Sequence, residues 1–386
     1  MLQSFLVYTI TAFLLYALAK NLALRDAYKQ RQYNRQVSFW CPEIILSFLI
    51  FALVAGMRYN VGVDHLGYLK SYLYLQETGQ FRIEHEIGFN YLSKFFANVG
   101  FHFIIFFGFL AFLQIFFIYY ALKDRKFLLP YVALNIMLGS YFLDWMNGIR
   151  QCIVICAFVF LIKYIVERKF IKYAIAILIL STIHKSAYIL IPFYFLFIKD
   201  FSFTNRKICL IILAICVLIG MSPTWTNIIT KAEPLLSLLN YDQYAENIEK
   251  LSSTTRQTAW GPTRLGIFLT EVLIIWFYPK MKDYFKFDKY LSAYFLLFLI
   301  GAFTTNLLVN TLSIFLRPIG YFTIFRLPLT AYLLYYLKQN HKNAMFIFLA
   351  LIVFTFMYIT IYKSIAMPTD ANKTHLYHFF FEAINL

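Results

Sequence analysis

Charged residues are scarce in this chain of 386 amino acids. Aspartate, glutamate, lysine and arginine make up 14% of the sequence, whereas soluble globular domains contain roughly 25%. Hydrophobic residues account for 61% and aromatic residues for 20%. This composition excludes a cytosolic enzyme, a disordered regulator and a small secreted protein built on disulfides. A mean hydropathy of +0.65 indicates apolar segments along the whole chain, so we predict an all-α polytopic membrane protein.

Cysteine is also rare, and the sequence contains no pattern typical of a metal site. All five cysteines lie within or at the edge of apolar runs, where a thiol behaves as a small apolar side chain. Cys152 and Cys156 are one helical turn apart, but we expect them to pack rather than to bind metal. The sequence has no Asp-x-Asp motif, which argues against a metal-dependent enzyme that uses nucleotide sugars. We therefore predict no metal and no cofactor.

Apolar runs separated by charged or turn-rich stretches follow one another along the chain, and we expect each to be helical. One of them, 173–198, is apolar for 26 positions yet lies between two basic segments. A single crossing would put these segments on opposite sides of the membrane, although basic segments stay in the cytoplasm. We therefore predict a hairpin of two short helices that turns near 181–186, which gives about 12 transmembrane segments in one integral membrane domain, 1–386. The runs cover 2–19, 38–56, 101–121, 127–143, 147–166, 173–198, 208–222, 263–279, 290–310, 319–337 and 343–362.

The net charge of +16 is distributed unevenly between alternate connecting segments. Six short segments carry 21 of the 35 basic residues, whereas most acidic residues lie in the other set. Because basic residues are retained on the cytoplasmic side, this asymmetry predicts that both termini and the two long loops, 57–97 and 223–262, are external. The basic residues are dispersed over six segments rather than gathered on one face, so we expect no nucleic-acid partner.

Polar residues cluster in the first long loop, close to the membrane. Arg58, Asp64 and Tyr68 lie among glycines that suggest tight turns, so their side chains could lie near one another. An arginine that merely snorkels beside a turn-rich loop is the alternative. Further along, Glu84 and Glu86 could bind a divalent cation or supply a general base, although a solvated loop edge explains them equally well. We favour Glu86 of this pair.

A second polar group lies at the outer end of the fifth run. Asn147, Arg150 and Gln151 are spaced i, i+3 and i+4 and therefore share one helical face. An arginine that enters an apolar helix is costly unless an anion pairs with it, and a planar guanidinium suits phosphate oxygens. Pairing with Asp144 alone is the alternative.

The turn of the predicted hairpin carries a third group, His184, Lys185 and Ser186. Three polar residues at a helix break favour a site in which the histidine could be a base or an anion ligand. The alternative is a histidine that only forms packing and hydrogen-bonding contacts within the membrane.

Two arginines, Arg317 and Arg326, lie at the start of the run 319–337. Nine residues of straight helix turn about 900°, so these arginines would face opposite ways unless a nearby proline or glycine breaks the helix. Arg317 lies nearer the outer surface and is the better candidate ligand, whereas a functional and a structural role are equally compatible with Arg326. Arginines, a histidine and carboxylates at the outer boundary suggest a lipid pyrophosphate that carries a glycan.

These residues resemble the EpsG-like branch of the Wzy-type polysaccharide polymerases. The resemblance runs from about residue 50 to 330, and its short motifs keep their order and their positions relative to the apolar runs. They are the pattern G-x-R-x-x-x-G-x-D-x-x-x-Y from Gly56 to Tyr68, Glu86-Ile87-Gly88-Phe89, Asn147-Gly148-Ile149-Arg150-Gln151, His184-x-Ser186-Ala187, and Arg317 with Tyr321-Phe322.

The resemblance implies a bacterial inner-membrane enzyme whose architecture is similar to that of integral-membrane glycosyltransferases and O-antigen ligases. Such an enzyme joins undecaprenyl-pyrophosphate-linked oligosaccharide repeats into O-antigen, capsule or exopolysaccharide on the outer face of the membrane. Its expected partners are this lipid-linked glycan, membrane lipids and a chain-length regulator. An O-antigen ligase-like transferase and a lipid-linked glycan flippase or transporter are the alternative functions.

A polymerase of this kind needs positive charge for the departing pyrophosphate and a base for the acceptor proton. We assign Arg58, Arg150 and Arg317 to the first role. For the base we propose His184, with Glu86 or Asp64 as the alternative. The other residues expected to bind pyrophosphate or glycan are Tyr68, Asn147, Gln151, Lys185, Ser186, Tyr321 and Arg326.

Overall fold

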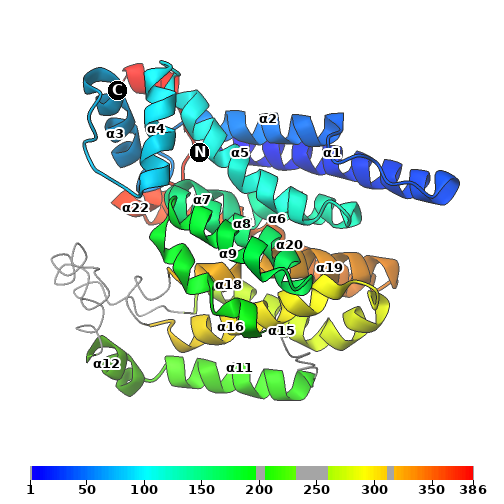
Figure 1. Cartoon of the computed structure of the whole chain (residues 1–386). Helices are drawn as coiled ribbons and strands as arrows, with labels where there is room; N and C mark the ends of the chain where they lie inside the picture. Colours follow the sequence, from blue (N-terminus) through cyan, green and yellow to red (C-terminus); the bar gives the residue numbers. More distant parts are fainter. Residues whose placement is uncertain (1, 197–204, 232–259, 311–316, 386) are drawn as a thin grey trace. The chain divides into compact units, whose positions relative to one another are not determined.

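The computed structural model describes residues 2–196, 205–231, 260–310 and 317–385, and its regular structure is almost entirely helical (Figure 1). The chain divides into two compact units, residues 1–200 with 330–386 and residues 201–329. The first unit contains α1 Leu2–Tyr33, α2 Pro42–Gly56, β1 Arg58–Tyr59, α3 His65–Thr78, α4 Ile87–Asn98, α5 Phe103–Ala121, η1 Lys126–Leu128, α6 Leu129–Leu138, α7 Tyr141–Asn147, α8 Ile149–Val166, α9 Phe170–Ser181, η2 Lys185–Leu190, α10 Phe193–Leu196, α20 Asn343–Phe354, α21 Phe356–Ala366, α22 Asp370–Lys373, β2 His378–Phe379 and η3 Phe380–Asn385. The second contains α11 Arg206–Gly220, α12 Pro223–Lys231, α15 Pro262–Tyr284, α16 Lys289–Leu307 and α18 Gly320–Thr323, and α19 Arg326–Gln339 begins in it and ends in the first.

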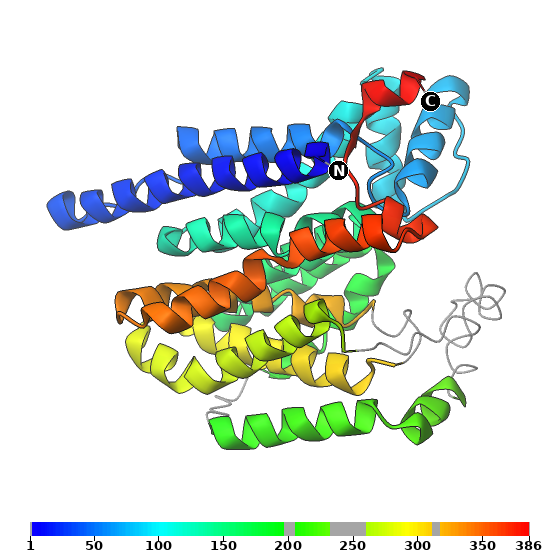
Figure 2. The ribbon, with the colours of Figure 1, turned by 180° about the vertical axis from the view of Figure 1, so that it is seen from behind.

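Long apolar helices form the body of the first unit. α1 packs on α2 and α6, α2 packs on α5, and α5 packs on α8 (Figures 1 and 2). The ring of Phe142 lies 5.8 Å from that of Tyr8 and 5.6 Å from that of Phe51, so aromatic side chains fill the space between these helices. Large apolar side chains such as Ile10 and Phe13 are exposed on α1. Exposed apolar side chains on a long helix are expected when lipid surrounds it.

Five described helices are long and apolar enough to cross a membrane, or six if one bent pair counts as a span. The pair consists of 126–138 and 141–147, which meet at 62°. Ser140 lies at the junction and has a φ of 67°, in the left-handed region that interrupts a helix. The run 38–56 forms the 15-residue helix α2, and the run 319–337 is divided between α18 and α19. The all-α membrane class is confirmed, but the count of about 12 segments is not.

The chain reverses direction within the run 173–198, as predicted. After α9 the chain turns, and η2 and α10 run back beside α9. The hydroxyl of Tyr173 donates to the carbonyl of Leu190 at 2.7 Å, and the rings of Tyr173 and Tyr194 lie 5.6 Å apart. The returning arm begins as a 3-10 helix instead of the predicted α-helix. This reversal puts residues 182–186 at the tip of the hairpin.

The first long loop, 57–97, forms α3 and α4 and packs on the end of α5. The ring of Tyr72 on α3 stacks on that of Phe106 on α5, with a centroid distance of 4.6 Å. β1 of this loop pairs antiparallel with β2, which ties the loop to the C-terminal segment. The same segment contacts the start of α1, because the backbone N–H of Tyr377 donates to the Ser4 hydroxyl at 2.9 Å. The two ends of the described chain therefore lie beside this loop (Figure 2).

In the second unit, α11 packs on α15 and α16, and α16 packs on α18. Trp225 of α12 donates its indole N–H to the carbonyl of Leu307 at 2.9 Å, so α12 is joined to the end of α16. Most of the second long loop, 223–262, lies outside the described residues. Its described parts are α12 and residues 260–262, where α15 begins.

Candidate functional site

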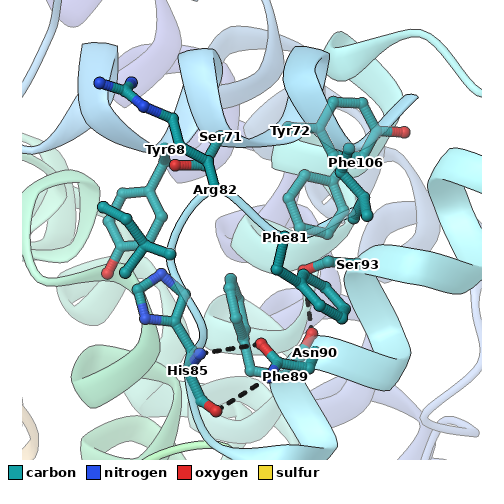
Figure 3. A pocket seen from close by; sticks show the side chains of 12 residues that line it. Tyr68, Ser71, Tyr72, Phe81, Arg82, His85, Phe89, Asn90, Ser93 and Phe106 are labelled. Atoms are coloured by element: carbon teal, nitrogen blue, oxygen red, sulfur yellow. Dashed lines mark hydrogen bonds between the residues drawn. The ribbon is translucent and has the colours of Figure 1, made fainter. Parts of the chain in front are cut away.

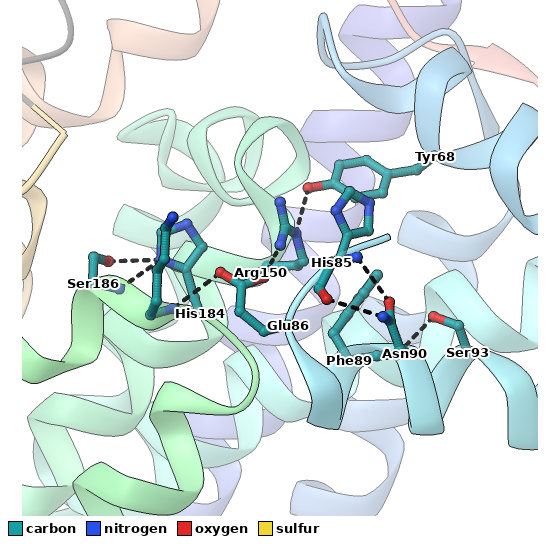
Figure 4. A network of polar contacts seen from close by, with 10 residues as sticks. Tyr68, His85, Glu86, Phe89, Asn90, Ser93, Arg150, His184 and Ser186 are labelled. Atoms are coloured by element: carbon teal, nitrogen blue, oxygen red, sulfur yellow. Dashed lines mark hydrogen bonds and ion pairs between the residues drawn. The ribbon is translucent and has the colours of Figure 1, made fainter. Parts of the chain in front are cut away.

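Arg150 is at the centre of a polar network that joins three segments far apart in the sequence (Figure 4). It is the second residue of α8, and its Nε donates to the hydroxyl of Tyr68 on α3 at 3.1 Å. Its Nη1 forms an ion pair with Glu86, the residue before α4. The ring of Phe89 lies 5.5 Å from the guanidinium carbon, within the range of a cation–π contact. The side chains of Arg150 and Glu86 keep 18% and 17% of their exposure, so both can be reached from solvent.

Glu86 connects this arginine to the tip of the hairpin. One carboxylate oxygen pairs with Arg150, and the other accepts the backbone N–H of Lys185 at 3.0 Å. At the tip, Nδ1 of His184 lies 2.6 Å from the Ser186 hydroxyl and 3.4 Å from the Ser186 backbone nitrogen. A backbone N–H can only donate, so Nδ1 of His184 accepts this hydrogen bond and carries no proton. A neutral His184 in this arrangement therefore carries its proton on Nε2. The network thus brings together six predicted site residues: Tyr68, Glu86, Arg150, His184, Lys185 and Ser186.

Two more predicted residues, Asp64 and Asn147, contact each other where the loop before α3 meets α7. The side-chain oxygen of Asn147, at the end of α7, accepts the backbone N–H of Asp64 at 3.2 Å. Gly62 has a φ of +91°, and a Cβ there would lie 2.8 Å from the carbonyl oxygen of Met146. Glycine is therefore required where this loop approaches α7. Gln151 follows Arg150 on α8.

Arg58 is positioned differently from Arg150. Arg58 as a whole is only 1% exposed, and its guanidinium donates to the carbonyls of Ala55 and Val61. The ring of Phe107 lies 5.3 Å from the guanidinium carbon. Arg58 therefore orders the loop that leads from α2 toward α3, and its contact with pyrophosphate stays a prediction.

Burial and neighbouring charges determine the protonation of the groups around Arg150. Burial raises the pKa of Glu86, but the backbone N–H of Lys185 and the charge of Arg150 outweigh it, so this pKa lies below its ordinary value. Burial, together with Arg150, lowers the pKa of His85 to about 4. Burial raises the pKa of Tyr68, so its hydroxyl stays protonated. At neutral pH the network therefore contains a cation, an ionised carboxylate, and neutral His85 and Tyr68.

A small cavity lies next to the network, between α3, α4 and α5 (Figure 3). Its lining includes Tyr68, His85 and Asn90, and its volume is about 20 Å³. The side chain of Asn90 hydrogen-bonds both to the backbone N–H of His85, at 3.0 Å, and to its carbonyl, at 2.9 Å. This volume holds about one water molecule, so the cavity is too small for a sugar ring.

The model of the EpsG family matches residues 44–377, which include every residue of this network. The chain belongs to the EpsG family. Family membership assigns it to the membrane proteins of polysaccharide biosynthesis, with an activity of the polymerase type and a glycosyltransferase-like reaction. No curated protein and no solved structure matches the chain.

The other predicted residues of this EpsG-family protein belong to the second unit. Arg317 is exposed, and Tyr321 is fully buried. Arg326 opens α19, and its Nη1 lies 3.7 Å from a carboxylate oxygen of Glu271 on α15. Because α18 and α19 are separate helices, Arg317 and Arg326 do not lie on one straight helix. Sequence reasoning missed Glu271. An acidic residue inside the apolar run 263–279 is unusual and could have marked it as a candidate.

A close backbone contact holds the hairpin tip against α4 in this EpsG-family protein. The backbone N–H groups of Gly88 and Phe89 both donate to the carbonyl of Thr182, at 2.8 and 3.1 Å. A Cβ at position 88 would overlap the Thr182 side chain. Glycine at this position therefore allows Glu86 to reach the backbone of Lys185.

We expect Gly88→Ala to lower the free energy of unfolding by about 1–3 kcal/mol and to reduce activity, because the added methyl pushes the hairpin tip away from α4. The melting temperature of the purified protein measures the first effect. Gly67→Ala is the matched control, since a Cβ at position 67 of α3 meets nothing within 4 Å. Equal melting temperatures for the two variants would contradict the prediction.

The stability contribution of Glu86 should depend on pH, because its pKa is lowered in the folded protein. A carboxylate whose folded pKa lies below its unfolded value of about 4.3 stabilises the protein above that value and loses this contribution as the pH falls through the folded pKa. We therefore expect Glu86→Gln to lower the melting temperature at about pH 7 and to have a smaller effect at about pH 3. Glu84→Gln, on the exposed part of the same loop, is the control and should change neither value. An equal loss at both pH values would show that the charge of Glu86 is not the cause.

Proposed function

We propose that this EpsG-family protein joins oligosaccharide repeats that are linked to undecaprenyl pyrophosphate, on the outer face of the bacterial inner membrane. The observation that carries the proposal is the network in which Arg150, Glu86 and the hairpin tip meet. It combines a partly exposed guanidinium with a histidine–serine pair. Glycosyl transfer from a lipid pyrophosphate needs these two elements, a cation for the leaving group and an acceptor for a proton.

Arg150 is the proposed ligand of the departing pyrophosphate. A guanidinium has five N–H donors in a planar fork that matches phosphate oxygens. Two of these donors are used by Tyr68 and Glu86 within the described part of the chain. The two contacts fix the plane of the guanidinium, so that its other edge can meet an anion without first being ordered. Arg58 and Arg317 remain proposed contributors of positive charge.

His184 is the proposed base, acting through Ser186. The acceptor sugar hydroxyl attacks the anomeric carbon of the donor, and a C–O bond forms while the bond between that carbon and the pyrophosphate oxygen breaks. The electron pair of the broken bond leaves with the pyrophosphate. The acceptor proton passes to Oγ of Ser186 as Ser186 passes its own proton to Nδ1 of His184. Asp64 and Glu86 are the alternative bases, and the ion pair of Glu86 with Arg150 favours a positioning role for Glu86.

We also propose the membrane topology predicted from the charges: about 12 segments, both termini external, and the network on the outer side. No cofactor is proposed. The pairing of β2 with β1 in the loop 57–97 and the hydrogen bond between Tyr377 and Ser4 support this topology, because together they require both ends and that loop to share one side. A chain-length regulator is a proposed partner. The product, whether O-antigen, capsule or exopolysaccharide, is decided by the glycan that the strain supplies.

Incubating the purified protein with one lipid-linked repeat tests the function. We expect a ladder of products that grow by one repeat at a time. Movement of the lipid across a vesicle bilayer without bond formation would instead indicate a flippase. A reaction that begins only when a second, different lipid acceptor is added would indicate a ligase.

A further inference from the structure

An apolar groove of about 350 Å³ lies between α5, α8 and α9, all of which belong to the first unit. α9 packs on α8 (Figure 1), and Ala157 of α8 and Ala176 of α9 line the groove with side chains that end at Cβ. Larger apolar side chains, including Phe117 and Phe160, form its walls. The groove is large enough for a small molecule, because ligand sites usually measure about 300–1,000 Å³.

The groove follows α9 for most of the length of this helix. Lys172, Ile175 and Ile179 are spaced i, i+3 and i+7, so they share one helical face and line one side of the groove. From Lys172 to Leu180, which also lines it, the helix rises about 12 Å. The hydrocarbon layer of one leaflet is about 15 Å thick, half of the roughly 30 Å core of a bilayer. The groove therefore matches the depth of one acyl chain better than that of a chain that crosses the whole membrane.

The groove is open along its side. Ile175 and Ile179 line it and are still 52% and 62% exposed. On a helix of a membrane protein, apolar side chains that are exposed in this way face lipid. A lipid chain can therefore enter the groove sideways from the bilayer.

Polar groups gather at one end of the groove. Lys172 and Tyr164 line it where α8 ends and α9 begins, within the segment 163–172. This segment contains four basic residues and one acidic residue, Glu167. Nζ of Lys169 lies 2.6 Å from the Glu167 carboxylate, whereas Lys172 has no ion pair within the part of the chain that the structure describes. An exposed ammonium group without a carboxylate partner is therefore located at the end of an apolar groove.

We propose that this groove binds an anionic phospholipid, with one acyl chain between α8 and α9 and the phosphate at Lys172. The apolar walls match the chain, and the ammonium group matches the negative charge of the head group. Tyr164 lies at the same end, and tyrosine rings are enriched at the level of the lipid head groups. The predicted topology puts this end on the cytoplasmic side, where anionic lipids give the membrane surface its negative potential. The lipid site does not depend on the glycosyl transfer proposed at Arg150.

Native mass spectrometry of the full-length protein in detergent measures the binding of single lipid molecules. The probes are phosphatidylglycerol and phosphatidylcholine with the same acyl chains, because they differ in the net charge of the head group. We expect the first phosphatidylglycerol to bind the wild type about fivefold more tightly than phosphatidylcholine, the usual gain from one lysine near an anionic head group. Lys172→Gln should remove this preference. Lys169→Gln is the matched control and should keep it, because Lys169 is already paired with Glu167.

Filling the groove tests the position of the acyl chain separately from the charge. Ala176 is partly exposed in the groove, so Ala176→Phe puts a ring into the space and keeps Lys172. We expect this variant to lose the tight first binding event of phosphatidylglycerol while its melting temperature without lipid stays near that of the wild type. Leu178→Phe is the control and should bind as the wild type does, since Leu178 is exposed on α9 and does not line the groove.

Three results would overturn the proposal. The first is wild-type binding of phosphatidylglycerol in Ala176→Phe, because the chain would then lie elsewhere. The second is an equal loss of the preference for phosphatidylglycerol in Lys172→Gln and Lys169→Gln, which would mean that the general charge of the segment attracts the lipid. The third is displacement of phosphatidylglycerol by undecaprenyl phosphate at lower concentrations than by phosphatidylglycerol itself, which would assign the groove to a polyprenyl chain.

Discussion

Arg150→Gln should lower the rate of polymerisation about 100- to 1,000-fold, which is the usual effect of removing one preorganised donor that stabilises charge in a transition state. The physical reason is that the pyrophosphate gains negative charge as the anomeric bond breaks, and Arg150 is held in place for it by Tyr68 and Glu86. The measurement is the initial rate of ladder formation by the purified variant. Arg150 contacts the donor both before and during bond breaking, but the pyrophosphate carries more negative charge in the transition state. We therefore expect kcat to fall more than KM rises.

Two further variants separate charge stabilisation from a structural effect. Arg150→Lys keeps the charge but loses the planar fork, so it should recover part of the activity. Arg82→Gln removes the same charge from an exposed position on the same loop as Glu86, and it should behave like the wild type. A wild-type rate in Arg150→Gln, or equal rates in Arg150→Gln and Arg82→Gln, would remove Arg150 from the site.

His184→Asn should lower the rate about 100-fold or more, because a positioned general base contributes typically 10²- to 10⁴-fold. Imidazole is the side chain whose unperturbed charge change falls between pH 5 and 8, so the wild-type rate should decline toward the acidic end of this range. Glu86 is not expected to cause that decline, since its pKa lies below the ordinary carboxylate value and it stays ionised. The pH profile of the residual activity in His184→Asn should therefore be flat between pH 5 and 8.

The control for this prediction is His102→Asn. His102 is an exposed histidine that caps α5 by accepting the backbone N–H of Ile104, and asparagine can replace it in that role. It should retain the wild-type rate and pH profile. An acidic decline that persists in His184→Asn would reject His184 as the base and would leave Asp64 as the candidate to test.

The candidate site shows which residues sequence reasoning could find and which it could not. Arg150, Glu86 and His184 could be found singly: Arg150 at the start of an apolar run, His184 at the turn of the predicted hairpin, and Glu86 as one of two carboxylates in the loop 57–97. The contact of Glu86 with Arg150 spans 64 residues, and that with Lys185 spans 99. The distance along the chain carries no information on such contacts, because they depend on how α4, α8 and the hairpin pack.

The carbonyl of Thr182 was not predicted at all. Its role comes from a backbone oxygen that accepts two N–H groups of α4. The identity of a side chain does not predict such a backbone contact. The contact of Glu271 with Arg326 was missed for a different reason. The sequence placed Arg326 at a possible helix break, but its carboxylate partner lies 55 residues earlier in another helix.

The sequence by itself determined the membrane class, the alternation of basic and acidic segments, the reversal in 173–198 and the family motifs. These follow from composition and from short-range order, because the cost of burying charge in lipid acts on each segment separately. Only the tertiary structure decided that Tyr68, Glu86, Arg150 and the hairpin tip share one network, and that Arg58 is buried beneath its loop. Those outcomes depend on close packing between distant segments, where a single methyl group at Gly88 is enough to separate them.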